Sequence, residues 1–82
     1  MRKFTFDGYD KGWNAVIQGA IVGTVFVPDS CTWDDHTCYH HAHQLAALMA
    51  EGFTRKEAGE TMENRHCVDV AGWRVVGARK IQ

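Results

Sequence analysis

The order of apolar and polar positions predicts strands at the start of the chain. Lys3–Phe6 alternates between polar and aromatic residues, which predicts a short strand. The next apolar stretch is rich in β-branched residues and predicts two strands, 13–18 and 21–27, that turn near Gly19-Ala20. A helix over residues 14–23 is the alternative, because periodicity alone does not separate buried strands from a buried helix.

The middle of the chain changes to a helical pattern between about residues 32 and 51, with residues 34–50 expected to form one continuous helix. At about 100° per residue, five small or apolar residues share one face. They are Cys38, Ala42, Leu45, Ala46 and Met49. Gly52 suits the position after the helix end. Thr54 and Glu57 match a capping box, which predicts a second helix over 55–63.

The last part of the chain predicts a β-hairpin around a two-residue turn at Ala71-Gly72. In that register Val70 faces Trp73, and Asp69 faces Arg74. One face is then apolar, formed by Val68, Val70, Trp73 and Val75. The sequence therefore predicts a single α+β domain over residues 1–82, with an antiparallel sheet (N-terminal meander plus C-terminal hairpin) packed against two helices.

The length and net charge of the chain limit the functions that it can have. The chain has 82 residues and is 45% hydrophobic, enough for one small core that a metal or a homo-oligomer interface would stabilise further. The net charge of −1 argues against a nucleic-acid binder and against binding to anionic membranes. Three cysteines cannot all pair within one chain, and the N-terminus has no apolar signal core. We therefore expect a cytoplasmic protein that does not enter the membrane.

Four of the five histidines and two of the three cysteines lie between Cys31 and His43, in CTWDDHTCYHHAH. On a helix, His36, His40 and His43 share one face, and Cys38 points nearly the opposite way. One metal ion therefore cannot bind Cys38 together with His36 or His40 unless the helix unwinds.

Two metal sites are compatible with this geometry. The pair His36 and His40 has the i, i+4 spacing that chelates Zn²⁺, Ni²⁺ or Cu²⁺. The other is a zinc site that joins the helix to the sheet, formed by Cys31, Cys38, His41 and Cys67, with His66 as an alternative ligand. Neither contains the short Cys-x₂₋₄-Cys spacing of structural zinc sites. The simpler interpretation is that no cofactor is bound, the thiols are small core residues and the histidines are solvated.

The segment that starts at Trp33 also predicts a protein-binding surface, because exposed aromatic residues provide most of the energy at interfaces. Its candidate contact residues are Trp33, Asp35, His36, His40 and His43. No nucleophile, base and oxyanion site occur together, so we expect no enzyme activity. The leading hypothesis is a small interaction protein, an inhibitor or adaptor of the compact kind that phages and mobile elements encode.

A DNA-binding regulator is the remaining alternative. Residues 52–54 separate the two predicted helices as in a helix-turn-helix, and Arg55 and Lys56 would begin the recognition helix. Three glutamates on the same helix oppose contact with phosphates: Glu57, Glu60 and Glu63. The sequence therefore favours an ordinary pair of capped helices.

Overall fold

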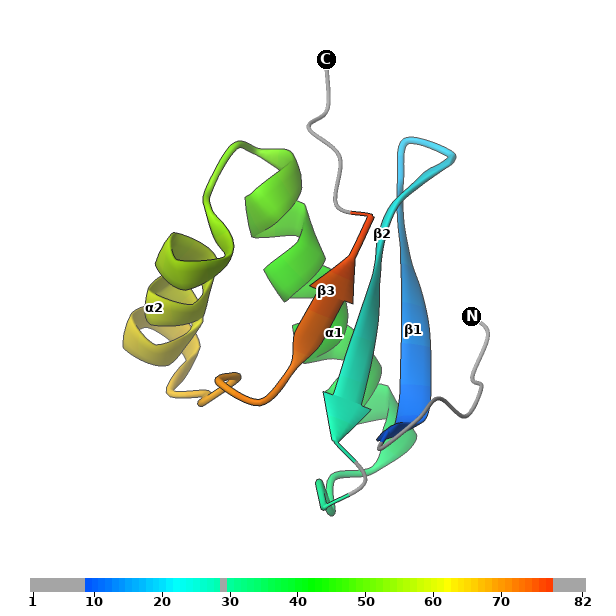
Figure 1. The fold of residues 1–82 in the computed structure, drawn as a ribbon, viewed down its shortest axis with the longest axis vertical. Coiled ribbons are helices and arrows are strands. Elements are labelled where there is room, and N and C mark those ends of the chain that lie inside the picture. Colours follow the sequence, from blue (N-terminus) through cyan, green and yellow to red (C-terminus); the bar gives the residue numbers. More distant parts are fainter. Residues whose placement is uncertain (1–8, 29, 78–82) are drawn as a thin grey trace.

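The computed structural model describes residues 9–28 and 30–77 and contains a three-stranded sheet and two helices (Figure 1). The elements are β1 (Tyr9–Ile17), β2 (Ala20–Pro28), α1 (Asp35–Ala50), α2 (Arg55–His66) and β3 (Arg74–Val76). Both strand pairs are antiparallel, and the order in the sheet is β1-β2-β3. The predicted fold class, a small α+β domain, is confirmed. The strand predicted over Lys3–Phe6 lies outside the described residues.

Strands β1 and β2 form a tight hairpin, as predicted, and the alternative helix over residues 14–23 is wrong. The turn lies one residue earlier than predicted, and β1 begins at Tyr9, before the predicted start at residue 13. The two turn residues, Gln18 and Gly19, have φ values of 52° and 79°. Two consecutive residues with positive φ give the turn whose twist matches that of the flanking strands. A β-bulge shifts the register between Ala15 and Val16.

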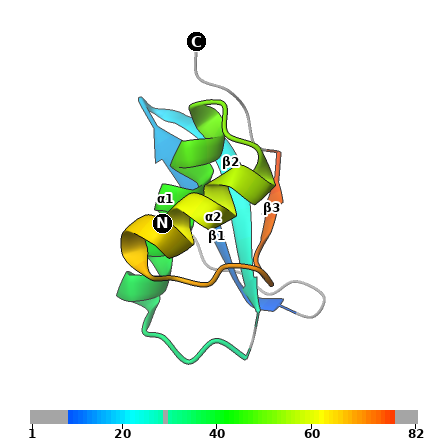
Figure 2. The same cartoon turned by 90° about the vertical axis from the view of Figure 1, so that its left-hand side faces the viewer.

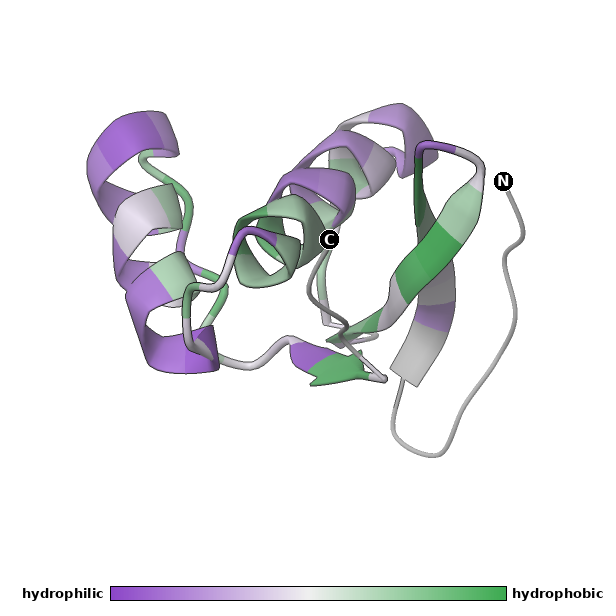
Figure 3. Cartoon of the chain, turned by 90° about the horizontal axis from the view of Figure 1, so that it is seen from above, coloured by the Kyte–Doolittle hydropathy of each residue, from purple (hydrophilic) through white to green (hydrophobic). Residues whose placement is uncertain are grey.

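The sheet has an inner face against α1 and an outer face that points away from both helices (Figure 3). Alternating positions of the two long strands enter the core, among them Trp13, Ala15, Val25 and Val27. Val16, Ile21 and Val76 are between 44% and 49% exposed. Phe26 is 6% exposed, and the Arg74 guanidinium lies over its ring at 5.4 Å.

Helix α1 lies between the sheet and α2 (Figure 2) and supplies the centre of the core. Its buried residues are Cys38, Ala42, Leu45, Ala46 and Ala50. Alanines at these positions allow the neighbouring backbones to approach closely. Met49, predicted for this face, is only partly buried, and Ala50 takes its place because the face drifts around the axis along four turns. The thiol therefore points inward, whereas His36 and His40 are exposed, as predicted.

Helix α2 begins with the predicted capping box. The Thr54 hydroxyl accepts a hydrogen bond from Glu57 N (3.1 Å), and the Glu57 carboxylate accepts one from Thr54 N (3.0 Å). The helix continues three residues beyond the predicted end at Glu63 and packs on α1 through Ala58 and Met62. Cys67, with φ 55°, ends it in the left-handed conformation typical of helix C-termini.

The predicted C-terminal hairpin is wrong in its strand pairing. The turn at Ala71-Gly72 is present, closed by a 3.0 Å hydrogen bond from Trp73 N to Val70 O, but residues 67–70 form no strand. Strand β3 pairs instead with β2, with Val75 opposite Val25. The apolar positions are nevertheless inside: Val68, Val70 and Trp73 are at most 8% exposed, and Val75 is partly buried. Asp69 and Arg74 are exposed, as predicted, without forming the predicted pair in a ladder.

Candidate functional site

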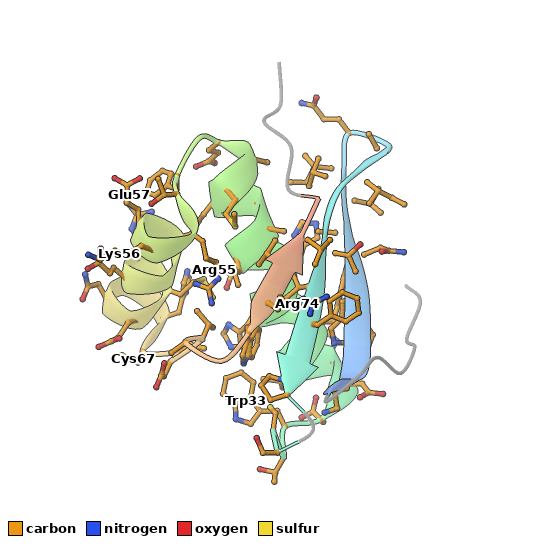
Figure 4. All side chains as sticks on the ribbon, viewed as in Figure 1. Trp33, Arg55, Lys56, Glu57, Cys67 and Arg74 are labelled. Atoms are coloured by element: carbon orange, nitrogen blue, oxygen red, sulfur yellow. The ribbon has the colours of Figure 1, made fainter. Side chains whose placement is uncertain are left out.

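A groove lies at the end of the molecule where β2 ends, between the loop that follows β2 and the turn that precedes β3. Its volume is about 390 Å³. It is lined by Pro28, Ser30, Cys31, Thr32, Trp33, Asp69, Ala71, Gly72 and Trp73. We call it the Trp33 groove; Figure 4 shows the position of Trp33 beside the end of β2. Its size falls in the range of about 300–1,000 Å³ typical of ligand pockets.

The loop side of the groove is fixed to β1 by a buried lysine. Lys11 Nζ donates a 2.8 Å hydrogen bond to the backbone oxygen of Trp33 and lies 3.9 Å from the Asp35 carboxylate. Lys11 is only 7% exposed, and a buried ammonium group needs such partners because burial removes its water. Cys31 N also donates to Pro28 O at 3.0 Å, which tightens the loop. The main chain at Trp33 is therefore held in place before any ligand arrives.

The turn side of the groove is fixed to α2 by Arg55. Its guanidinium donates hydrogen bonds from the same nitrogen, Nη2, to Val70 O and to Trp73 O, the second at 3.0 Å. Figure 4 shows Arg55 directed from α2 toward the last strand. Burial lowers the pKa of Arg55 from its ordinary value. Asp69 orders the turn from within, since its carboxylate accepts a 3.0 Å hydrogen bond from Ala71 N.

Five rings form what we call the aromatic cluster: Trp33, Trp73, His40, His41 and His66. The centroids of Trp33 and Trp73 are 5.8 Å apart with planes at 68°, an edge-to-face arrangement. His41 lies 5.3 Å from Trp33, 5.6 Å from His40 and 6.3 Å from His66. The cluster joins the groove to the exposed imidazoles of α1 and α2.

The predicted partner-binding residues fall into two groups. Trp33 lines the groove and reaches His40 through His41, and His36 is exposed one turn before His40. His43 connects α1 to β1, because its Nε2 donates a 3.0 Å hydrogen bond to Val16 O. Asp35 is exposed but interacts with the buried Lys11.

The thiols of the zinc hypothesis lie in different environments. Cys38 is fully buried in the core, Cys31 is partly buried beside the groove and Cys67 is exposed at the end of α2. Burial raises the pKa of the Cys38 thiol, which opposes the ionisation that metal binding requires. His41 faces Trp33 and the other imidazoles. Within residues 9–28 and 30–77, no group of three or more His, Cys, Asp or Glu side chains is placed to hold a metal ion.

Comparison of the chain with protein-family models, with curated proteins and with solved structures finds no significant match. Among the described residues, neither helix has the length and apolar character needed to cross a bilayer.

Four residues that build the groove were not assigned to a site from the sequence: Lys11, Arg55, Asp69 and Trp73. Arg55 was considered for phosphate contact, but its guanidinium is bonded to the protein's own carbonyl groups. One local signal was available, because an aspartate two residues before Ala71 in a Gly-containing turn is typical of an Asx turn. The contact of Trp33 with Trp73 joins distant parts of the chain and has no local signal.

Asp34 follows Trp33 and caps the N-terminus of α1. Its contribution to the stability of the fold depends on pH. Its carboxylate accepts hydrogen bonds from Thr37 N (2.8 Å) and Thr37 Oγ1 (3.1 Å), which lower its pKa from the ordinary 3.8. The ionised cap therefore stabilises the fold above that value, and the contribution is lost as the pH falls through the lower folded-state pKa.

We expect Asp34→Asn, which keeps an acceptor but no charge, to be less stable than the unmodified chain at about pH 6 and to approach it below about pH 3. Urea unfolding followed by circular dichroism at both pH values measures the difference. A difference that does not change with pH would contradict the assigned role of the carboxylate.

Proposed function

We propose that this protein acts by binding a partner protein, with the Trp33 groove and the neighbouring imidazoles as its contact surface. The observation that supports the proposal is a groove whose two sides come from distant segments and are each fixed by a cationic side chain. Lys11 fixes the loop side, and Arg55 fixes the turn side. A surface held in its binding conformation loses little conformational entropy on association, so its contacts contribute more to affinity.

The composition of the surface suits a protein partner. Trp33 is partly exposed at the groove, and tryptophan is among the residues most enriched in the energetic centres of protein interfaces. His40 and His66, which contact Trp33 through His41, and His36, one turn before His40, are exposed and supply polar groups for the rim of an interface. An inhibitor or an adaptor would both use such a surface, and the choice between them stays a prediction.

The test is capture of partners from the cells that encode the chain, with the whole chain immobilised through a terminal affinity tag, followed by quantitative mass spectrometry. We expect a protein that is retained by the unmodified chain and lost with Trp33→Leu, with at least about a tenfold decrease in recovery. The double variant His36→Ala/His40→Ala is expected to reduce recovery of the same protein by less.

Glu60→Gln serves as the matched control, because Glu60 is exposed on α2 and does not line the Trp33 groove. Circular dichroism must show that each variant is folded. The proposal fails if folded Trp33→Leu retains the same proteins as the unmodified chain, or if Glu60→Gln loses them equally.

A further inference from the structure

Negative charge predominates among the described residues at the Trp33 groove. Among the described residues that line the groove, Asp69 alone bears a formal charge. Asp34 and Asp35 lie next to the lining residue Trp33 and are both exposed. The groove therefore presents a negative charge beside two indole rings.

The two cations that fix the sides of the groove are bonded to the protein's own backbone. Lys11 donates to the backbone oxygen of Trp33, and Arg55 donates to the backbone oxygens of Val70 and Trp73. Both charges point at carbonyl groups of the walls, and neither residue lines the groove. Within the described part of the chain, the Asp69 carboxylate forms no ion pair, and it accepts a hydrogen bond from the neutral backbone N–H of Ala71.

The two indoles add a second attraction for a cation. Both indoles line the groove, where they contact each other edge to face at 68°. Tryptophan has the most negative π-face of the aromatic residues and attracts ammonium and guanidinium groups. The guanidinium group is planar and less strongly hydrated than an ammonium group, so it stacks on an indole and can also donate two hydrogen bonds to a carboxylate.

We infer that the Trp33 groove binds an arginine side chain of the partner, with the guanidinium against the indole rings and paired with Asp69. This inference rests on the proposed function, since it names the chemistry of the partner segment at the same surface. Lysine would be accepted more weakly, because its ammonium group does not stack and retains its water more strongly.

The experiment is a titration of the full chain, labelled with ¹⁵N, with N-acetyl-arginine methylamide. N-acetyl-citrulline methylamide, a neutral compound of nearly the same shape, is the control probe. The indole N–H signals of Trp33 and Trp73 are expected to shift in a saturable way, whereas that of Trp13, which is 5% exposed in the core, stays in place. We expect the citrulline compound to bind about tenfold more weakly, the effect of losing one cation–π contact and one ion pair.

Two variants separate the charge from the shape of the groove. Asp69→Asn keeps the side-chain oxygen that accepts from Ala71 N and removes only the charge, so we expect a loss of affinity of about tenfold. Gly72→Ala leaves all charges unchanged, and its added methyl group would lie 3.4 Å from Pro28 Cγ, across the groove lining. We expect it to weaken binding of both probes by the same factor.

Equal binding of the two probes, or an Asp69→Asn variant that binds arginine as well as the unmodified chain does, would overturn the inference. Absence of any indole shift at millimolar probe would overturn it as well. A captured partner that depends on Trp33 but is retained by Asp69→Asn removes this inference and leaves the proposed function intact. Arginine binding without a captured protein keeps the groove chemistry and removes the proposed function.

Discussion

Replacing Leu45 with alanine is expected to lower the free energy of unfolding by about 3 kcal/mol. Leu45 is fully buried and is among the largest fully buried side chains of the core. Deleting its three outer carbon atoms removes apolar burial and leaves a cavity in α1, the helix between the sheet and α2 (Figure 2). Domains of this size are stable by about 5–15 kcal/mol, so the loss is a large fraction of the total.

Urea unfolding followed by circular dichroism measures the effect. An unchanged slope of the free energy of unfolding against urea concentration would show that the mutation leaves the compactness of the folded and unfolded states the same. Leu48→Ala is the matched control, because Leu48 is on the same helix but only partly buried. Its expected cost is about 1 kcal/mol. Equal losses at the two positions would show that Leu45 is not at the centre of the core.

Replacing Arg55 with methionine is expected to lower the free energy of unfolding by about 2 kcal/mol. Methionine keeps much of the apolar length of the side chain but removes the hydrogen bonds to Val70 O and Trp73 O. Both carbonyl groups then lose a charged donor, and the turn at residues 69–73 loses its connection to α2. Urea unfolding measures the cost, and indole N–H shifts of Trp73 report the change in the turn. Lys56→Met, at the exposed neighbouring position, is expected to cost less than about 0.5 kcal/mol.

Gly59 provides an independent check on Arg55. A β-carbon at this position would lie 2.8 Å from Arg55 Nη1, so Gly59→Ala must displace the guanidinium. Alanine otherwise favours a helix over glycine by about 1 kcal/mol. We expect that gain to appear in the Arg55→Met background and to be absent or reversed with Arg55 present. The same stabilisation in both backgrounds would show that Arg55 moves aside without cost.

The parts of the fold that were predicted correctly depend on local chemistry. The apolar, β-branched run with Gly19 near its middle specifies the first hairpin, and the Thr54–Glu57 pair specifies the start of α2. These signals act over a few residues and do not depend on distant parts of the chain.

The C-terminal error shows where local patterns stop being sufficient. The apolar alternation from Val68 to Val75 identified the buried positions. It did not specify which strand this segment pairs with, because the same residues can be buried in more than one arrangement. In the predicted hairpin, Val70 and Trp73 would exchange two hydrogen bonds. In the structure Trp73 N still donates to Val70 O, while Trp73 O accepts from Arg55. A tertiary contact to α2 thus replaces one bond of the ladder, and β3 pairs with β2.

Only part of the candidate site was predicted, because local patterns do not show which distant residues come into contact. Trp33 could be singled out because it stands beside acidic residues and histidines before a helix. Its neighbour across the groove, Trp73, was assigned to the core, where its 8% exposure indeed places it. No spacing in the sequence relates these two residues, because tertiary contacts bring them together: the pairing of β3 with β2 and the hydrogen bonds from Lys11 and Arg55.

The short strand β3 makes the contact surface sensitive to partial opening of the molecule. Among the described residues, β3 pairs with β2 at three positions, and these partners of Thr24, Val25 and Phe26 come after both helices in the chain. Closing so long a segment is entropically costly, and brief pairing offers few bonds in return, so this region is expected to open first in native-state hydrogen exchange. Binding at the Trp33 groove and the docking of β3 are thereby coupled. A molecule that has released β3 keeps its helices and first hairpin but loses one of the two sides of the groove.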